Sequence, residues 1–289
     1  MDLFGGDSTG TSETISLFVI ILLVLGSIWL CRRTRFHTLP PPIEFHPISF
    51  MQTLGAFLIY FLLLPIFILI LVFSGRIQVK EALAGEGWLQ SILVASLFVS
   101  FVGYCALIKP ATRLLIFWGN RKPTRERVVR SIGAGAFTWL LSYPWVLLVS
   151  SVTALIARFV WHVESVDQVA IRELKKVADN PILFAITGFS IIFIIPFIEE
   201  LLFRGFLQSF LRKHLKRWGA LITTAALFSC MHFSRSQGIG NFQLIVSLFT
   251  LSLFLGFLYE KQQTLLASYT LHATFNAITV ILLAFQIHV

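Results

Sequence analysis

The feature that constrains this chain most is a series of long apolar runs with very few charged residues. A transmembrane helix needs about 20 mostly apolar residues to cross about 30 Å of hydrocarbon. Eight stretches approach or exceed this length, and the sixth is the shortest: 15–31, 50–74, 88–108, 131–160, 182–203, 218–233, 242–259 and 264–286. These runs predict an all-α fold, a polytopic transmembrane helical bundle of about eight spans.

The composition of the chain supports the same class. Charged residues make up only 13% of the sequence and apolar residues 56%, whereas soluble domains carry about 25% charged residues. A chain with so little charge cannot cover a globular surface with solvated side chains. We therefore expect membrane lipid to cover most of its surface.

The basic residues predict the orientation of the chain. A net charge of +9 would favour nucleic-acid binding in a soluble protein. Here the Lys and Arg residues lie between apolar runs, where they contact lipid headgroups, so no nucleic-acid partner is expected. With the N-terminus outside, the alternating loops place most of the basic residues on the inner side, as the positive-inside rule requires. The sequence thus predicts a multi-pass integral membrane protein with both termini outside.

The polar segments divide the chain into two predicted parts. Residues 1–160 form an N-terminal accessory region of about four spans, and residues 181–289 form a core of about four spans. This core holds nearly all the polar residues inside spans that are candidates for function. Residues 37–48 are a Pro-rich inner linker. The polar outer segment 161–180 is expected to contain a short surface helix that ends at Asn180 and Pro181.

Three cysteines lie far apart in apolar runs, without the spacing of a metal site or a disulfide framework. They are Cys31, Cys105 and Cys230. We expect all three to be small core residues.

The first group of ionisable residues inside a span is Glu199, Glu200 and Arg204. Such residues cost about 2.5–3.5 kcal/mol each on insertion, so they are functional candidates. Glu200 and Arg204 are i,i+4 neighbours that can pair on one helix face. Glu199 points about 100° away and has different surroundings. The alternative is that the group only marks the inner membrane boundary, which two consecutive glutamates fit poorly.

Two further groups lie in later spans. Phe228 precedes His232 by four residues, and His272 precedes Asn276 by the same spacing, so each pair projects from one helix face. Taken alone, His232 fits a hydrogen-bonded core histidine. His272 and Asn276, taken alone, fit an interhelical hydrogen-bond pair.

Together the three groups have a chemical meaning. Two carboxylates, two histidines and an amide on three spans supply a general base, a possible metal shell and oxyanion donors, which are the parts needed to hydrolyse a peptide bond. Measured from the inner side of the membrane, His232 is expected to lie deeper than His272. The groups can therefore meet only if the sixth helix begins below the membrane or is tilted.

The ordered trio resembles the CPBP intramembrane proteases, which include type II CAAX prenyl endopeptidases, bacteriocin-processing enzymes and abortive-infection-like proteins. This family is marked by the motifs E-E-x-x-x-R, F-x-x-x-H and H-x-x-x-N. The sequence matches them at 199–204, 228–232 and 272–276. The resemblance covers roughly residues 181–289.

The resemblance implies an intramembrane endopeptidase that uses Glu-activated water and opens toward the cytosol. It also implies a bacterial plasma membrane location and a protein or peptide substrate that can be lipid-modified. The residues it assigns are Glu199 as water activator, Glu200, His232, His272 and Asn276 as site-lining residues, Arg204 as partner of Glu200, and Phe228 as a packing residue.

The question of a metal stays open at this stage. A catalytic zinc takes three protein ligands and keeps a position for water, and His232, His272 and Glu200 are the candidate ligands, with Glu199 as base. In the metal-free alternative, Glu199 and His232 activate the water while His272 and Asn276 donate hydrogen bonds to the oxyanion. The amide favours the metal-free version, because amides are uncommon zinc ligands.

Two other classes of function compete with a protease. A catalytically idle scaffold or immunity-type membrane protein could use the same fold. A proton-coupled transporter is also possible in principle, because Glu–His clusters in membranes relay protons. The sequence shows no internal repeat of the kind that transporters often carry.

Overall fold

The computed structural model describes residues 8–41, 48–76, 87–119, 121–162 and 169–288. Within these ranges every regular element is helical, which confirms the all-α class. The elements are α1 (Ser8–Arg33), α2 (Phe50–Phe73), α4 (Gly87–Leu107), α5 (Pro110–Trp118), α6 (Arg125–Trp161), α7 (Val169–Lys176), α8 (Pro181–Phe189), the π-helix η1 (Ser190–Ile194), α9 (Ile195–Glu200), the π-helix η2 (Leu201–Gln208), α10 (Ser209–Leu211), α11 (Arg217–Cys230), the 3-10 helix η3 (Arg235–Gln237), α12 (Gly240–Gln262) and α13 (Leu265–His288).

The polytopic membrane class is also confirmed. Six helices in the described ranges are long and apolar enough to cross a membrane: Phe50–Phe73, Gly87–Leu107, Arg125–Trp161, Pro181–Leu211, Gly240–Gln262 and Leu265–Phe285. Helix α1 covers the first expected span. Helix α11 has 14 residues, about 21 Å at 1.5 Å per residue, which is shorter than the sixth span was expected to be. The total of eight spans stays a prediction.

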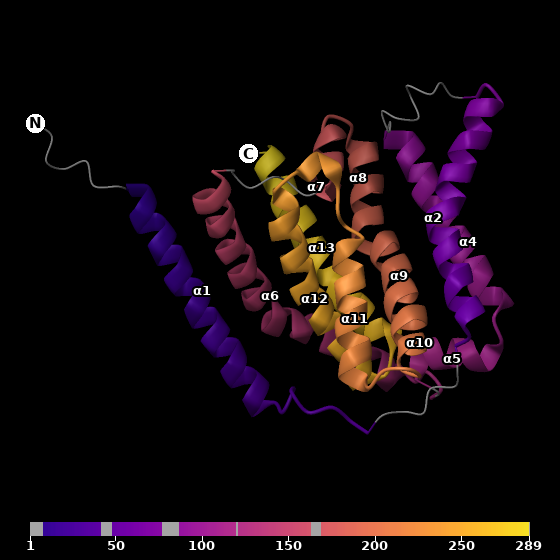
Figure 1. Ribbon diagram of the computed structural model, residues 1–289, viewed down its shortest axis with the longest axis horizontal. Helices are drawn as coiled ribbons and strands as arrows, with labels where there is room; N and C mark the ends of the chain where they lie inside the picture. The colour runs from indigo at the N-terminus through magenta and orange to yellow at the C-terminus, as the bar shows by residue number, and fades with distance from the viewer. Residues whose placement is uncertain (1–7, 42–47, 77–86, 120, 163–168, 289) are drawn as a thin grey trace, which may run out of the picture.

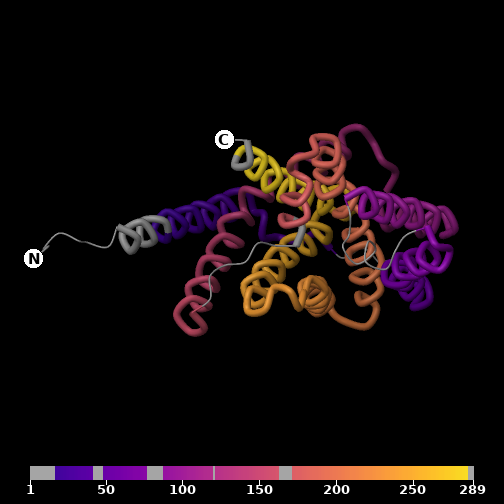
Figure 2. Tube along the Cα trace, turned by 90° about the horizontal axis from the view of Figure 1, so that it is seen from above, coloured from indigo at the N-terminus to yellow at the C-terminus, as the bar shows by residue number. Residues whose placement is uncertain are grey.

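The long helices run alternately up and down the molecule (Figure 1). The start of α1 and the end of α13 lie at the same end, and the starts of α2, α6, α11 and α13 lie at the other. Seen from above, α1 lies on one side of the bundle and α2 and α4 lie on the opposite side (Figure 2). The C-terminal helices fill the space between them.

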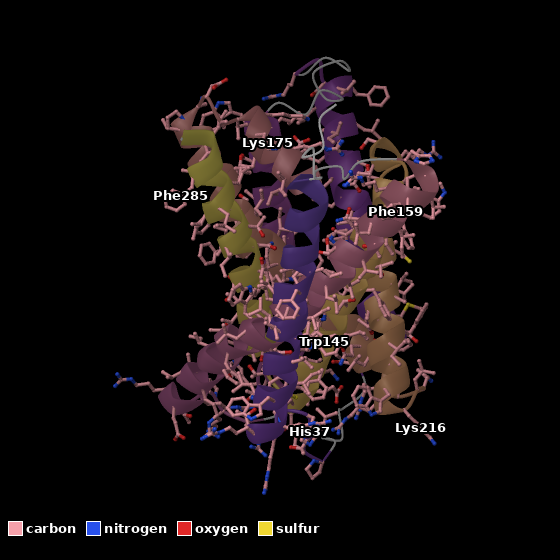
Figure 3. All side chains as sticks on the ribbon, turned by 90° about the vertical axis from the view of Figure 1, so that its left-hand side faces the viewer. His37, Trp145, Phe159, Lys175, Lys216 and Phe285 are labelled. Atoms are coloured by element: carbon pink, nitrogen blue, oxygen red, sulfur yellow. The ribbon has the colours of Figure 1, made fainter. Side chains whose placement is uncertain are left out.

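The two ends of the molecule carry the residues that the charge pattern assigned to opposite sides. His37 and Lys216 lie at one end and Lys175 lies at the other (Figure 3). We call the first the basic end and the second the α7 end. The predicted inner linker and outer segment therefore lie at opposite ends, whereas the alternation over eight spans and the side of the membrane that each end faces stay predictions.

Buried clusters join the two predicted parts of the chain. One cluster combines Phe101 of α4 with Phe203 and Phe206 of η2, and another combines Leu141 of α6 with Leu255 of α12. Each side chain is at most 2% exposed. The boundary near residue 160 is thus crossed by extensive packing, and the division into an accessory region and a core stays a prediction.

Several smaller expectations can be compared with the structure. The surface helix of the outer segment is α7, and the Asn180 side chain accepts hydrogen bonds from the backbone N–H groups of Ile182 and Leu183, which caps α8. Cys105 is buried and Cys31 is half-buried. The expectation of a core position is wrong for Cys230, which is exposed at the last residue of α11.

Candidate active site

The two adjacent glutamates lie on one long helix that is interrupted by π-helical turns. Helix α9 carries Glu199 and Glu200, with η1 before it and η2 after it. Pro196 lies in the first turn of α9 and has no backbone N–H, so the regular i→i−4 ladder cannot continue through it. Because π-bulges add a residue to a turn and occur often at functional sites, this local geometry decides which way both carboxylates point.

Glu200 forms a fully buried ion pair with Arg204, as the i,i+4 spacing predicts. Arg204 Nη1 lies 2.9 Å from Glu200 Oε1, and both side chains have zero exposure. Arg204 Nη2 donates to the hydroxyl of Ser252 on α12 at 2.6 Å. The guanidinium therefore fixes Glu200 and ties the glutamate helix to α12.

His272 and His232 both use Nδ1 for a structural hydrogen bond. His272 Nδ1 lies 3.0 Å from Glu200 Oε1, and His232 Nδ1 lies 2.9 Å from the carbonyl oxygen of Phe228. A carbonyl or an ionised carboxylate can only accept, so Nδ1 carries the proton in each ring. The Nε2 atom of each ring is thereby left available for chemistry.

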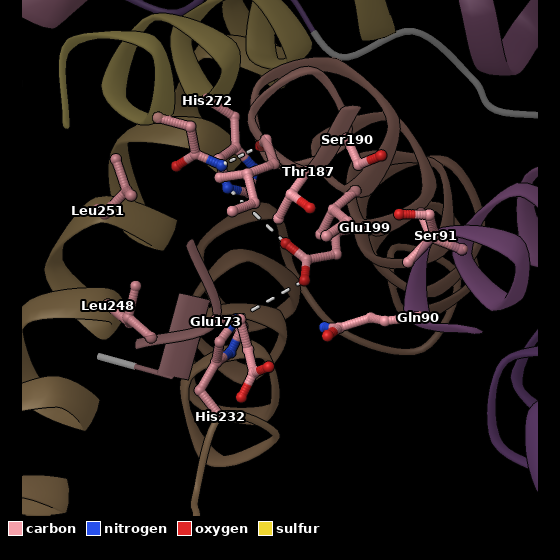
Figure 4. Close-up of a pocket in the computed structure, with 14 residues that line it drawn as sticks. Gln90, Ser91, Glu173, Thr187, Ser190, Glu199, His232, Leu248, Leu251 and His272 are labelled. Atoms are coloured by element: carbon pink, nitrogen blue, oxygen red, sulfur yellow. Dashed lines mark hydrogen bonds and ion pairs between the residues drawn. The ribbon is translucent and has the colours of Figure 1, made fainter. Parts of the chain in front are cut away.

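The carboxylate of Glu199 lies between these two Nε2 atoms (Figure 4). Oε1 is 3.7 Å from His232 Nε2, and Oε2 is 3.7 Å from His272 Nε2. Both separations exceed the length of a direct hydrogen bond. Glu199 is only 7% exposed, so the arrangement leaves a narrow place for a small reactant beside a base that is largely shielded from solvent.

A cavity of about 280 Å³ connects these groups. It is lined by Glu199, His232, His272 and Asn276 together with Gln90, Ser91, Val94, Glu173, Thr187, Ser190, Ile191, Ile195, Leu248 and Leu251. The structure thus brings residues of all three sequence groups to one cavity. Its lining includes Gln90 and Ser91 of α4 and Glu173 of α7.

Asn276 and Phe228 take different places around the cavity. The Asn276 amide donates to the carbonyl oxygen of Ile191 in η1 at 2.8 Å, so its orientation depends on the π-helical turn. Phe228 is fully buried. Its ring centroid lies 4.8 Å from Arg204 Cζ and 5.9 Å from the His272 ring, which makes it the packing surface under both groups.

The position of His232 differs from the expected one. We expected it well inside the sixth span, but α11 ends at Cys230 and His232 lies two residues further on. The ring is therefore held by a turn that follows the helix, where its Nε2 can reach Glu199 in spite of the expected difference in depth.

Sequence reasoning missed the hydroxyl groups of the site. Ser252 anchors Arg204, and Ser190 and Thr187 line the cavity. Each lies in a largely apolar run, which is a weak signal, because hydroxyl side chains can bond to the helix backbone and cost little in a membrane span.

A catalytic zinc ion requires three protein ligands around one point. Among the described residues, no group of three or more His, Cys, Asp or Glu side chains could hold a metal ion. Glu200 lies against Nδ1 of His272, on the ring edge away from Glu199, and it is also bonded to Arg204. His232, His272 and Glu200 therefore do not fit one tetrahedral ion in this arrangement.

Residues 181–278 match the family model described as type II CAAX prenyl endopeptidase Rce1-like. This part of the chain is Rce1-like. The Rce1-like segment contains all three motifs, which confirms the resemblance to the CPBP proteases. No curated protein and no solved structure matches the chain. With six membrane-length apolar helices, the protein is an integral membrane protein that contains a CAAX-protease-like segment.

Proposed function

We propose that this protein is an intramembrane endopeptidase in which Glu199 activates water for hydrolysis of a peptide bond. The observation that carries the proposal is the Glu199 carboxylate, which faces Nε2 of two histidines inside a cavity of the bundle. The Rce1-like match supports proteolysis and a protein or peptide substrate at the membrane.

The proposed reaction needs no metal. A water molecule beside Glu199 and His232 loses a proton to the Glu199 carboxylate as its oxygen attacks the carbonyl carbon of the scissile bond. The carbonyl oxygen becomes an oxyanion. Asn276 donates a hydrogen bond to it, and so does His272 in the form in which Nε2 also carries a proton. The carbon–nitrogen bond then breaks, and Glu199 gives its proton to the leaving amine. The products are a carboxylic acid and an amine.

The fixed groups around the site serve this step. The Glu200–Arg204 pair orients the His272 ring through Nδ1. The direction of Nε2 is therefore set before the reaction begins. Burial of Glu199 beside apolar cavity residues such as Leu248 and Leu251 limits the access of bulk water. We further propose a lipid-modified substrate, a bacterial plasma membrane location and outer termini, as the family resemblance and the charge pattern indicate.

The test is cleavage of a peptide library by the purified full-length protein in detergent, with prenylated and unprenylated members. We expect cleavage by the wild-type protein and a loss of about 10²–10⁴-fold in rate for Glu199→Gln. Size-exclusion elution of the variant would show that it stays folded. Equal rates for the two proteins would overturn the role of Glu199. A wild-type protein that cleaves no member would favour the idle scaffold.

A further inference from the structure

A second cavity is lined by residues of α1, α6 and α12. Helix α1 lies on the opposite side of the bundle from α2 and α4 (Figure 2). The volume of the cavity is about 350 Å³. It is lined by Ser27, Ile28, Cys31, Arg32, Phe36, His37, Leu141, Trp145 and Phe254. It shares no lining residue with the cavity beside Glu199, so the proposed proteolysis does not account for it.

The interior of this cavity is apolar. Ile28, Leu141 and Phe254 contribute hydrocarbon from three helices. The polar atoms of the interior are already paired with protein groups, because Trp145 Nε1 donates to the Ser27 hydroxyl at 3.0 Å and that hydroxyl donates to the carbonyl oxygen of Val24 at 2.8 Å. Such an interior suits an alkyl chain better than a polar ligand.

The rim of the cavity carries a positive charge at Arg32. Arg32 and His37 line it and are exposed at the basic end of the molecule, where His37 lies below Trp145 (Figure 3). The rim is held in place by the chain that follows α1. Phe36 is buried against Phe257, and Lys261 Nζ donates to the carbonyl oxygen of Thr38 at 2.6 Å. The chain that follows α1 is therefore held against α12 beside the cavity.

We propose that this cavity binds one anionic phospholipid. Its phosphate lies at Arg32 and His37, and one acyl chain lies against Ile28, Leu141 and Phe254. Charge complementarity selects the headgroup, because an arginine guanidinium binds phosphate through paired hydrogen bonds. The apolar interior selects a ligand with a long chain. Such a lipid holds α1 against α6, along which α1 packs. The proposal does not depend on proteolysis.

The test is lipid binding to delipidated full-length protein, followed by native mass spectrometry. The probes are phosphatidylglycerol and phosphatidylcholine with the same acyl chains. We expect one retained phosphatidylglycerol, and a loss of affinity of about fivefold for Arg32→Gln. The matched control is Arg33→Gln, because Arg33 is equally charged and exposed but lies over Trp29, 5.0 Å from the ring centroid. It should change the affinity less than twofold.

A second pair of variants tests the apolar half of the site. Ile28→Trp should fill the cavity and prevent retention of the lipid, whereas Leu25→Trp, at a lipid-facing position that is 55% exposed, should not. Equal effects of the two arginine variants, or of the two tryptophan variants, would overturn the proposal in favour of general lipid adsorption. Competition by inorganic phosphate at the lipid concentration would overturn it in favour of a simple anion site.

Discussion

At the scale of single residues, Arg204 connects three groups around the site. It pairs with Glu200, is anchored by Ser252 on another helix and packs over the Phe228 ring. Its own exposure is zero. A side chain in this position sets the orientation of Glu200 and, through Glu200, that of His272.

The first prediction is that Arg204→Ala lowers both stability and activity. Removal of one partner from a buried pair leaves an uncompensated charge and costs about 3–5 kcal/mol. Thermal unfolding in detergent measures the effect. The matched control is Arg130→Ala, which removes an i,i+4 pair with Glu126 at the same kind of spacing, but with side chains 71% and 83% exposed. A shift as small as that of the control would contradict a buried pair.

The second prediction is that cleavage does not need a metal ion. Because Glu200 is occupied by Arg204 and His272 Nδ1, we expect full activity after strong chelation. Metal content measured on the same sample provides the comparison. One bound zinc whose removal stops cleavage and whose return restores it would replace the metal-free reaction with a zinc-dependent one.

At the scale of elements, the π-helical turns before and after α9 determine the direction of side chains in the site. Proline at position 196 interrupts the backbone ladder, and the carbonyl of Ile191 in η1 accepts a hydrogen bond from Asn276. The same turn thus positions a carboxylate on its own helix and an amide on α13. A regular α-helix through this region would rotate the following side chains by about 100° for each residue gained or lost.

The third prediction is that Pro196→Ala lowers the cleavage rate by about 10²-fold without lowering thermal stability, because small misplacements of catalytic groups have effects of that size. Pro65→Ala is the control, since Pro65 is also inside a long helix, α2, away from the cavity lining. It should leave the rate unchanged. An active Pro196 variant would mean that the π-helical turns do not aim the carboxylates.

At the scale of the whole molecule, the cavity beside Glu199 has a direction across the membrane. Gln90 lines it from α4, which starts at the α7 end, and Glu173 lines it from α7 itself. The distribution of basic residues predicts that this end is outside. The family resemblance implies a site that opens toward the cytosol, so the two expectations lead to opposite sides of the membrane.

The fourth prediction decides between them by labelling single cysteines in sealed cells with a membrane-impermeant thiol reagent. Cys31, Cys105 and Cys230 are first replaced by serine. We expect Gln90→Cys to react from outside and Lys122→Cys, an exposed position at the basic end, to react only after permeabilisation. The reverse labelling pattern would mean that the chain has the opposite orientation in the membrane and that the cavity opens toward the cytosol.

Local properties of the chain were determined by the sequence itself. Long apolar runs require helices in lipid, which the described structure confirms for six membrane-length helices. The spacing of Glu200 and Arg204 is sufficient to predict their pairing, because i,i+4 side chains on a helix are neighbours whatever surrounds them. The three motifs indicated the family over the C-terminal part, as the match to residues 181–278 confirms.

Only the tertiary structure decided the contacts between helices. The bond between Glu200 and His272 joins residues 72 positions apart, and that between Arg204 and Ser252 joins residues 48 apart. Periodicity shows that a helix forms but not which neighbour its polar face meets. The end of α11 before His232 and the π-helical turns beside Glu199 depend on backbone hydrogen bonds, which hydropathy does not report. The contact with Glu200 determines where Nε2 of His272 points, whereas the His232 ring is oriented by the carbonyl of Phe228 within its own motif.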